Sequence, residues 1–140
     1  MKTLTRETAF PDIALPALEV ACASSMGKYN PTDILAEIER GSMQVWLAKD
    51  GDALDGFLLT QLLNYPGYKT LRLMCCQAVS VVAVDFMGTI REYLPLLTVI
   101  EDWGRKLGCE LSEIEAPETW ELLLRGTEYV RGHVLLAKRL

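Results

Sequence analysis

The side chains best suited to act as nucleophiles or metal ligands are four cysteines and a single histidine. Cys75 and Cys76 are adjacent, while Cys22, Cys109 and His133 are scattered along the chain. Neighbours on a strand point to opposite faces, so Cys75 and Cys76 are expected neither to bridge each other nor to share a metal ion. One histidine and scattered thiols supply no zinc site. A cysteine nucleophile would need an adjacent base in an electropositive setting, and the sequence shows neither.

Three carboxylates lie close together and could act as a general base: Glu113, Glu115 and Glu118. Nothing in the sequence indicates that they are buried or partnered, so a solvated acidic edge is the alternative. Tyr129 and His133 fall in an apolar stretch. Tyr129 is expected to be a strand or core tyrosine, and His133 a hydrogen-bonded surface or packing residue. The residues themselves therefore assign no catalytic group.

The composition predicts one domain, residues 1–140, with its own core. The chain has 140 residues, is 50% hydrophobic and carries a net charge of -5. This charge argues against nucleic acid as a partner, because phosphate binding depends on clustered Lys and Arg. It also argues against a membrane surface, since no helix has a basic face. Without a long apolar run or a signal-like start, we expect a cytosolic protein or one packaged from the cytosol.

The candidate residues must be positioned by alternating strands and helices. Apolar spacing predicts a strand at 1–8, helices from 11 to 24–27 and at 31–40, strands at 43–49, 56–64 and 69–77, a helix with its apolar side at 90–107, a strand at 109–115, a short helix at 117–124 and a last strand at 129–138. Residues 81–84 could extend a strand or form a packed loop. Pro95 predicts a loose turn or a kink.

This order predicts an α/β fold: a mixed, mostly antiparallel central sheet with helices on both faces, in the order β-α-α-β-β-β-α-β-α-β. The helix at 31–40 has the clearest ends. Asn30 can cap it, Pro31 suits its first position, and Gly41 suits the residue after its end.

Short motifs follow one another in a characteristic order along the chain. They are Gly27-Lys28-Tyr29, Asp33-Ile34, the segment 41–47 (GSMQVWL), Trp103 with Gly108-Cys109, Trp120, and the segment 133–140 (HVLLAKRL). Together they resemble the GNAT superfamily of acyl-CoA N-acyltransferases, and within it the small GNAT-like proteins that phages encode. The predicted element order is similar to the GNAT fold over nearly the whole chain. Helix ends also explain the glycines, and core packing explains Trp46, Trp103 and Trp120, so the motifs indicate a fold rather than an active site.

The resemblance implies where acyl-CoA or acetyl-CoA would bind. In GNAT enzymes a glycine-rich loop leads into a helix N-terminus, whose backbone N–H groups hold the pyrophosphate. The corresponding stretch, Gln77 to Gly88, lacks the arginine and the second glycine of that pattern, and Asp85 would repel the ligand. If acyl-CoA binds, the resemblance implies backbone hydrogen bonds along the preceding strand. The implied cofactor-binding residues are then Met74, Cys75, Cys76, Gln77 and Gly88.

The resemblance also locates the family's general acid, a tyrosine shortly before a Gly-aromatic pair. Counting back from Tyr129 places Leu124 there, and leucine cannot donate a proton. The prediction is therefore a phage-type GNAT-fold protein that has lost catalysis and acts as a binding or structural protein, virion-associated or in the host cytoplasm. Its expected partners are phage or host proteins, with homo-oligomerisation open. The alternative is an acyl-CoA-dependent N-acetyltransferase with an atypical cofactor loop.

Overall fold

The computed structural model describes residues 1–79, 86–117 and 119–140, and only the backbone of residues 86 and 87. Its strands are β1 (Lys2–Glu7), β2 (Gln44–Asp50), β3 (Ala53–Asn64), β4 (Lys69–Ala78) and β5 (Leu111–Ile114). Its helices are α1 (Leu15–Ala23), α2 (Pro31–Arg40), α3 (Phe86–Tyr93), α4 (Leu97–Lys106) and α5 (Trp120–Leu123), with short 3-10 turns η1 (Asp12–Ala14) and η2 (Leu94–Leu96). Within the described ranges, none of these helices combines the length and apolar character needed to cross a bilayer.

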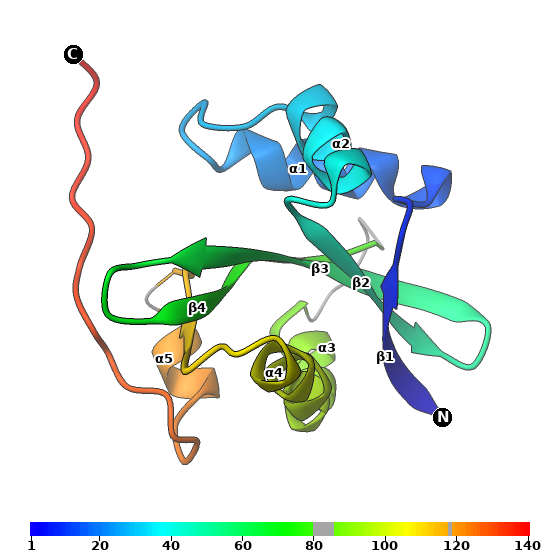
Figure 1. Ribbon diagram of the computed structural model, residues 1–140. Coiled ribbons are helices and arrows are strands. Elements are labelled where there is room, and N and C mark those ends of the chain that lie inside the picture. Colours follow the sequence, from blue (N-terminus) through cyan, green and yellow to red (C-terminus); the bar gives the residue numbers. More distant parts are fainter. Residues whose placement is uncertain (80–85, 118) are drawn as a thin grey trace.

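The strands form one five-stranded sheet in the order β1-β2-β3-β4-β5. Neighbours from β1 to β4 are antiparallel, whereas β5 runs parallel to β4. A parallel pair needs a crossover connection, which α3, η2 and α4 provide here. Figure 1 shows α1 and α2 on one side of the sheet and α3 and α4 on the other. The predicted class, a mostly antiparallel mixed sheet with helices on both faces, is confirmed.

Each face of the sheet is covered by its own apolar cluster. In β2, Val45 and Leu47 belong to the cluster under α1 and α2, while Trp46 belongs to the one under α3 and α4. This follows from the two-residue period of a strand. Trp46 is 3% exposed and meets the ring of Trp103 edge to face, with the centroids 5.4 Å apart. The predicted core role of these tryptophans is confirmed.

Helix α2 begins and ends where its capping residues predict. The Asn30 side chain accepts a hydrogen bond from the Asp33 N–H at 2.9 Å, and Pro31 is the first helical residue. Gly41 ends the helix with φ +78°, a left-handed conformation that suits glycine. Pro95 likewise acts as predicted, because α3 ends at Tyr93 and the proline lies in η2 before α4 begins.

The predicted last strand, 129–138, is wrong. Residues 129–140 have no regular secondary structure, and Figure 1 shows them in red as an extended segment along one side of the molecule. A strand requires hydrogen bonds to a neighbour, and no backbone group of residues 130–140 bonds to another backbone group among the described residues. The observed order therefore ends with α5 rather than with a final strand.

Candidate functional site

Strands β4 and β5 separate part-way along their length. Their pairing runs from Thr70↔Leu111 to Leu73↔Ile114, and the Glu115 N–H then donates to the Leu73 carbonyl at 3.0 Å. In the part of the chain that the structure describes, the rest of β4, residues 74–78, has a partner strand only on the β3 side. The other edge therefore offers backbone donors and acceptors to an extended ligand.

A β-bulge at Met74 shapes this edge. Two consecutive β3 residues pair with Cys75 and Leu73, which leaves Met74 as the extra residue of β4. Met74 and Cys75 pack together under α1 and α2, whereas Cys76 packs on the opposite face. The predicted opposite orientation of Cys75 and Cys76 is confirmed. Bulges are common beside active sites because they re-aim the local side chains.

The thiols beside this gap are held in their protonated form. Burial raises the pKa of Cys75 to about 12, and it also raises the pKa of Cys76. Nucleophilic attack and metal ligation both use the thiolate. No three His, Cys, Asp or Glu side chains of the described residues are grouped to hold a metal ion. Cys75 and Cys76 thus contribute backbone and packing to the gap.

The other residues that the resemblance implied lie at the two ends of the connection from β4 to α3. Gln77 is in β4, and its amide donates to the Ala78 carbonyl at 3.5 Å. Gly88 lies in the first turn of α3, which packs beside β4. The structure thus places Met74 to Gln77 on the unpaired stretch and Gly88 on the helix that follows. Asp85 and Glu118 lie outside the described residues.

A charged cluster lies at the end of β5, on the face that carries α1 and α2. Arg72 Nε donates to Glu113 Oε1 at 2.7 Å, and the Tyr65 hydroxyl donates to the same oxygen at 3.1 Å. Glu115 lies 3.9 Å from the nitrogens of both Arg72 and Lys28, and its side chain is 49% exposed. Of the carboxylates predicted as bases, Glu113 is held by partners, and Glu115 lies at the mouth of the gap.

A surface pocket of about 360 Å³ adjoins this cluster at Lys28. It lies between α2, the preceding loop and β3, and is lined by Lys28, Tyr29, Asp33, Ala36, Glu37, Arg40, Met43 and Gln61. Its volume is in the range of small-molecule sites. Two cationic and two anionic side chains line it, so its charge alone does not select a ligand.

The opposite face of the gap is closed by apolar side chains. Ile90, Trp120 and Leu123 form a buried cluster, against which β4 and β5 pack through Cys76 and Ile114. Trp120 is 8% exposed, as its predicted core role requires.

The residues at the predicted acid position do not bring a proton donor to the gap. Leu124 packs against the apolar cluster of α3 and α5. The Tyr129 hydroxyl lies 2.6 Å from Ser112 Oγ and donates to Glu101 at 3.3 Å, and burial raises its pKa to about 12. The sequence predicts a strand or core tyrosine at this position, whereas Tyr129 is half-buried, hydrogen-bonded and outside any strand.

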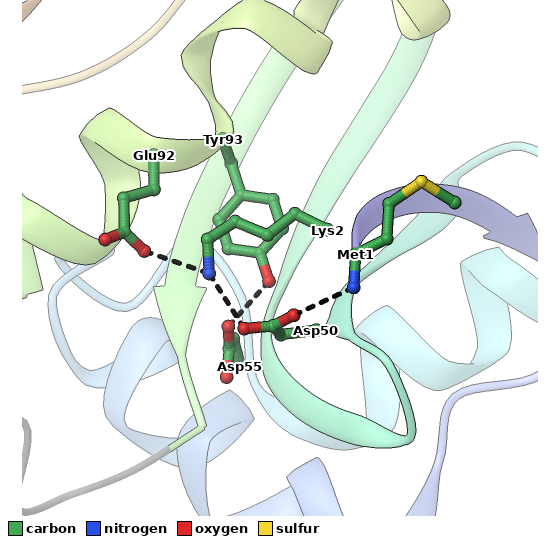
Figure 2. Close-up of polar contacts among 6 residues, drawn as sticks. All are labelled: Met1, Lys2, Asp50, Asp55, Glu92 and Tyr93. Atoms are coloured by element: carbon green, nitrogen blue, oxygen red, sulfur yellow. Dashed lines mark hydrogen bonds and ion pairs between the residues drawn. The ribbon is translucent and has the colours of Figure 1, made fainter.

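A polar cluster that the sequence did not reveal ties α3 to the β2–β3 hairpin (Figure 2). The Tyr93 hydroxyl donates to Asp55 Oδ2 at 2.6 Å. Lys2 Nζ lies 3.1 Å from the carboxylates of both Asp50 and Glu92. These bonds fix the end of the helix that follows the predicted cofactor-binding stretch. Tyr93 and Asp55 are 38 residues apart, so no local pattern could indicate their pairing.

The mixed, mostly antiparallel sheet with helices on both faces is a fold that this chain shares with solved GNAT acetyltransferases. The ribosomal-protein-alanine N-acetyltransferase from Brucella melitensis biovar Abortus 2308 matches with a TM-score of 0.66 at 12% identity, covering 100% of both chains. A GNAT family acetyltransferase from Staphylococcus aureus matches with a TM-score of 0.58 at 12% identity, covering 99% of each chain. The aminoglycoside N-acetyltransferase AAC(6')-Iy, solved in complex with CoA, matches with a TM-score of 0.62 at 10% identity. The match covers 100% of this chain and 95% of that chain. No family model and no curated protein matches the sequence.

Proposed function

We propose that the protein is an acyl-CoA-dependent N-acyltransferase of the GNAT superfamily that binds its acyl donor in the gap between β4 and β5. The observation that carries the proposal is the unpaired edge of residues 74–78, which begins at the bulge of Met74. An unpaired strand edge pairs readily with an extended chain of amides, and the pantetheine arm of CoA is such a chain. The shared fold with a CoA-bound acetyltransferase supports this assignment.

The chain's own groups would hold and orient the donor. Backbone groups of Met74, Cys75, Cys76 and Gln77 would pair with the arm. Backbone N–H groups in the first turn of α3, including Gly88, would approach the phosphates at the positive end of that helix. Bound acyl-CoA supplies the activated thioester.

Glu115 is the carboxylate best placed to accept the proton of an attacking amine. It follows β5 directly at the mouth of the gap, and its exposed side chain can reach an amine through one water. Lys28 lies 3.9 Å from Glu115 and also borders the surface pocket, so an acceptor in that pocket would lie next to the proposed base.

A binding role without catalysis is the second candidate, and one observation favours it. The buried cluster of Ile90, Trp120 and Leu123 closes one face of the gap, and Leu124 occupies the expected acid position. In that case the protein would be a phage-type scaffold on the GNAT fold, with phage or host proteins as partners.

Titration with acetyl-CoA separates the two candidates. We expect saturable heat and a thermal shift, since a ligand at 100 times its Kd stabilises the native state by about 2.7 kcal/mol. Gly88→Val should weaken binding at least tenfold. Gly67→Val is the matched control, because a Cβ at Gly67, in the β3–β4 turn, meets no atom within 4 Å. No binding at millimolar acetyl-CoA would refute the proposed transferase activity and favour the binding role without catalysis.

Turnover is tested separately with a panel of primary amines, by following the release of the CoA thiol. Glu115→Gln should lower kcat at least tenfold and leave the affinity for acetyl-CoA unchanged. Binding without turnover on any amine would refute the catalytic part of the proposal.

A further inference from the structure

One wall of the surface pocket is a single stripe of helix α2. Asp33, Ala36, Glu37 and Arg40 line the pocket and follow one another at the spacing of three and four residues that places side chains on one helix face. Ile34 belongs to the opposite face and is buried. Ala36 has the smallest side chain of the stripe, so it leaves space between its charged neighbours.

The charges of the pocket balance in number but not in pairing. Glu37 forms an ion pair with Arg40, and Lys28 lies 3.9 Å from Glu115. Asp33 is the exception, because no cation of the described residues pairs with its exposed carboxylate. The pocket therefore has one uncompensated negative charge, and the ligand that complements it carries a positive one.

Asp33 is also close to the unpaired edge of β4, with one residue between them. Burial raises the pKa of the Cys22 thiol in α1, and the Asp33 carboxylate raises it further. Cys22 in turn raises the pKa of Cys75, after burial, and both cysteines pack against the same apolar cluster. Electrostatic effects of this kind fall off with distance, so the three side chains are near one another. The pocket thus leads towards the stretch where the acyl donor is proposed to bind.

The remaining wall suits an aliphatic stem that ends in a cation. Tyr29 and the buried Met43 line the pocket beside Ala36. An aromatic face attracts ammonium groups, and the methionine side chain packs against methylene groups. The Tyr29 N–H donates to Ser25 Oγ at 3.2 Å, which holds the backbone that presents the ring.

We propose that the acyl acceptor is a small alkyl diamine, whose reacting amine lies at Glu115 while its second, protonated amine binds Asp33. This inference rests on the proposed transferase function and names its substrate class. Lys28 borders both Glu115 and the pocket, so the two carboxylates lie at different ends of the same site. A carboxylate is a strong hydrogen-bond acceptor for an ammonium group, and a monoamine would leave Asp33 without a partner.

The second amine takes no part in the bond changes. The reacting ammonium loses one proton to solvent, through water and Glu115, and its nitrogen then forms a bond to the thioester carbonyl carbon. The carbon–sulfur bond breaks, and the leaving CoA sulfur receives the second proton of the nitrogen. The products are a monoacylated diamine and the CoA thiol. The distal ammonium stays charged at Asp33 throughout, so it contributes to binding.

The first test compares diamines, from 1,3-diaminopropane to 1,6-diaminohexane, with the monoamines of the same chain length at saturating acetyl-CoA. We expect kcat/KM of the best diamine to exceed that of its monoamine by about tenfold, mainly through KM. Asp33→Asn should remove this preference by raising KM for the diamine and leaving KM for the monoamine unchanged. Glu39→Gln is the matched control, because it removes the same charge from an exposed position of α2 outside the pocket lining.

A reversal of charge gives a readout that a merely structural role of Asp33 would not move. Asp33→Lys should reject 1,4-diaminobutane and accept 4-aminobutyrate, whose carboxylate replaces the distal ammonium. Circular dichroism and thermal unfolding verify that all three variants fold. A variant at position 33 that keeps the preference of the natural chain overturns the inference.

The second test is calorimetric titration of the same amines into the protein without acetyl-CoA. We expect the diamines to bind more tightly than the monoamines in the natural chain and in Glu39→Gln, but not in Asp33→Asn. This result in a protein that turns over no amine would refute the transferase and still support Asp33 as the diamine ligand. Turnover of both amine classes with equal kcat/KM would overturn the acceptor class and leave the transferase standing. Equal affinity of the two classes for the natural chain also overturns the inference.

Discussion

Replacing Tyr93 by phenylalanine removes one hydroxyl at the junction of α3 and the β2–β3 hairpin. Tyr93 is 6% exposed, and its hydroxyl donates to the Asp55 carboxylate at 2.6 Å (Figure 2). A hydrogen bond to a charged acceptor stabilises the native state by about 1.5–3 kcal/mol. Asp55 is half-buried, so in the variant water can hydrogen-bond to its carboxylate and offset part of the lost free energy. We therefore expect Tyr93→Phe to lower the free energy of unfolding by about 1–2 kcal/mol.

Urea and thermal unfolding at pH 7 measure this loss. For a chain of this size the Tm should fall by about 3–8 °C. The matched control is Tyr68→Phe, because Tyr68 is 53% exposed and its hydroxyl has no hydrogen-bond partner within the part of the chain that the structure describes. Equal effects of the two substitutions would refute the role given to the Tyr93–Asp55 bond.

The pH dependence provides a second reading of the same bond. Burial and the Asp55 carboxylate raise the pKa of Tyr93 above the value of about 10 that it has in the unfolded chain. The native state then holds its proton where the unfolded chain has lost it. The contribution of Tyr93 is complete below pH 10 and is lost as the pH rises towards the raised pKa. Tyr93→Phe should flatten the alkaline loss of stability, and an unchanged slope would contradict this.

Three further predictions concern stability and are measured by urea unfolding. Asn30→Ala removes the N-cap of α2 and should cost about 1 kcal/mol; no loss would contradict the cap. Gly56→Ala places a Cβ 2.6 Å from the Gln77 carbonyl oxygen and should cost at least about 2 kcal/mol, whereas Gly67→Ala should change stability by less than about 0.5 kcal/mol. The raised pKa of the partly buried Cys75, about 12, predicts a loss of stability above about pH 8.5, at up to about 1.4 kcal/mol per pH unit. Cys75→Ala should flatten that loss, and an identical pH profile would contradict the burial of the thiol.

Local signals in the sequence were sufficient for the elements they specify. The cap of Asn30 and the glycine at 41 fix both ends of α2 within a few residues, so no distant contact is needed. The two-residue period of a strand predicts that Trp46 and its neighbours in β2 lie on opposite faces of the sheet. The opposite orientations of Cys75 and Cys76 follow from the same period.

Features that depend on distant partners could not be predicted. The bulge at Met74 exists only in the register between β3 and β4, and the Tyr93–Asp55 bond joins residues 38 positions apart. Residues 129–138 have the apolar content of a strand, but a strand also needs a neighbour to bond to, and a local pattern cannot supply that neighbour. The site residues of β4 could be named from the resemblance, whereas the early end of the β4–β5 pairing required coordinates.

The central claim is that the unpaired edge of β4 binds the acyl donor. Hydrogen–deuterium exchange of the chain with and without acetyl-CoA tests it most directly. We expect added protection on residues 74–78 and the first turn of α3, with little change at residues 70–73, which are already paired on both sides. Saturating acetyl-CoA that leaves the exchange of residues 74–78 unchanged would contradict it.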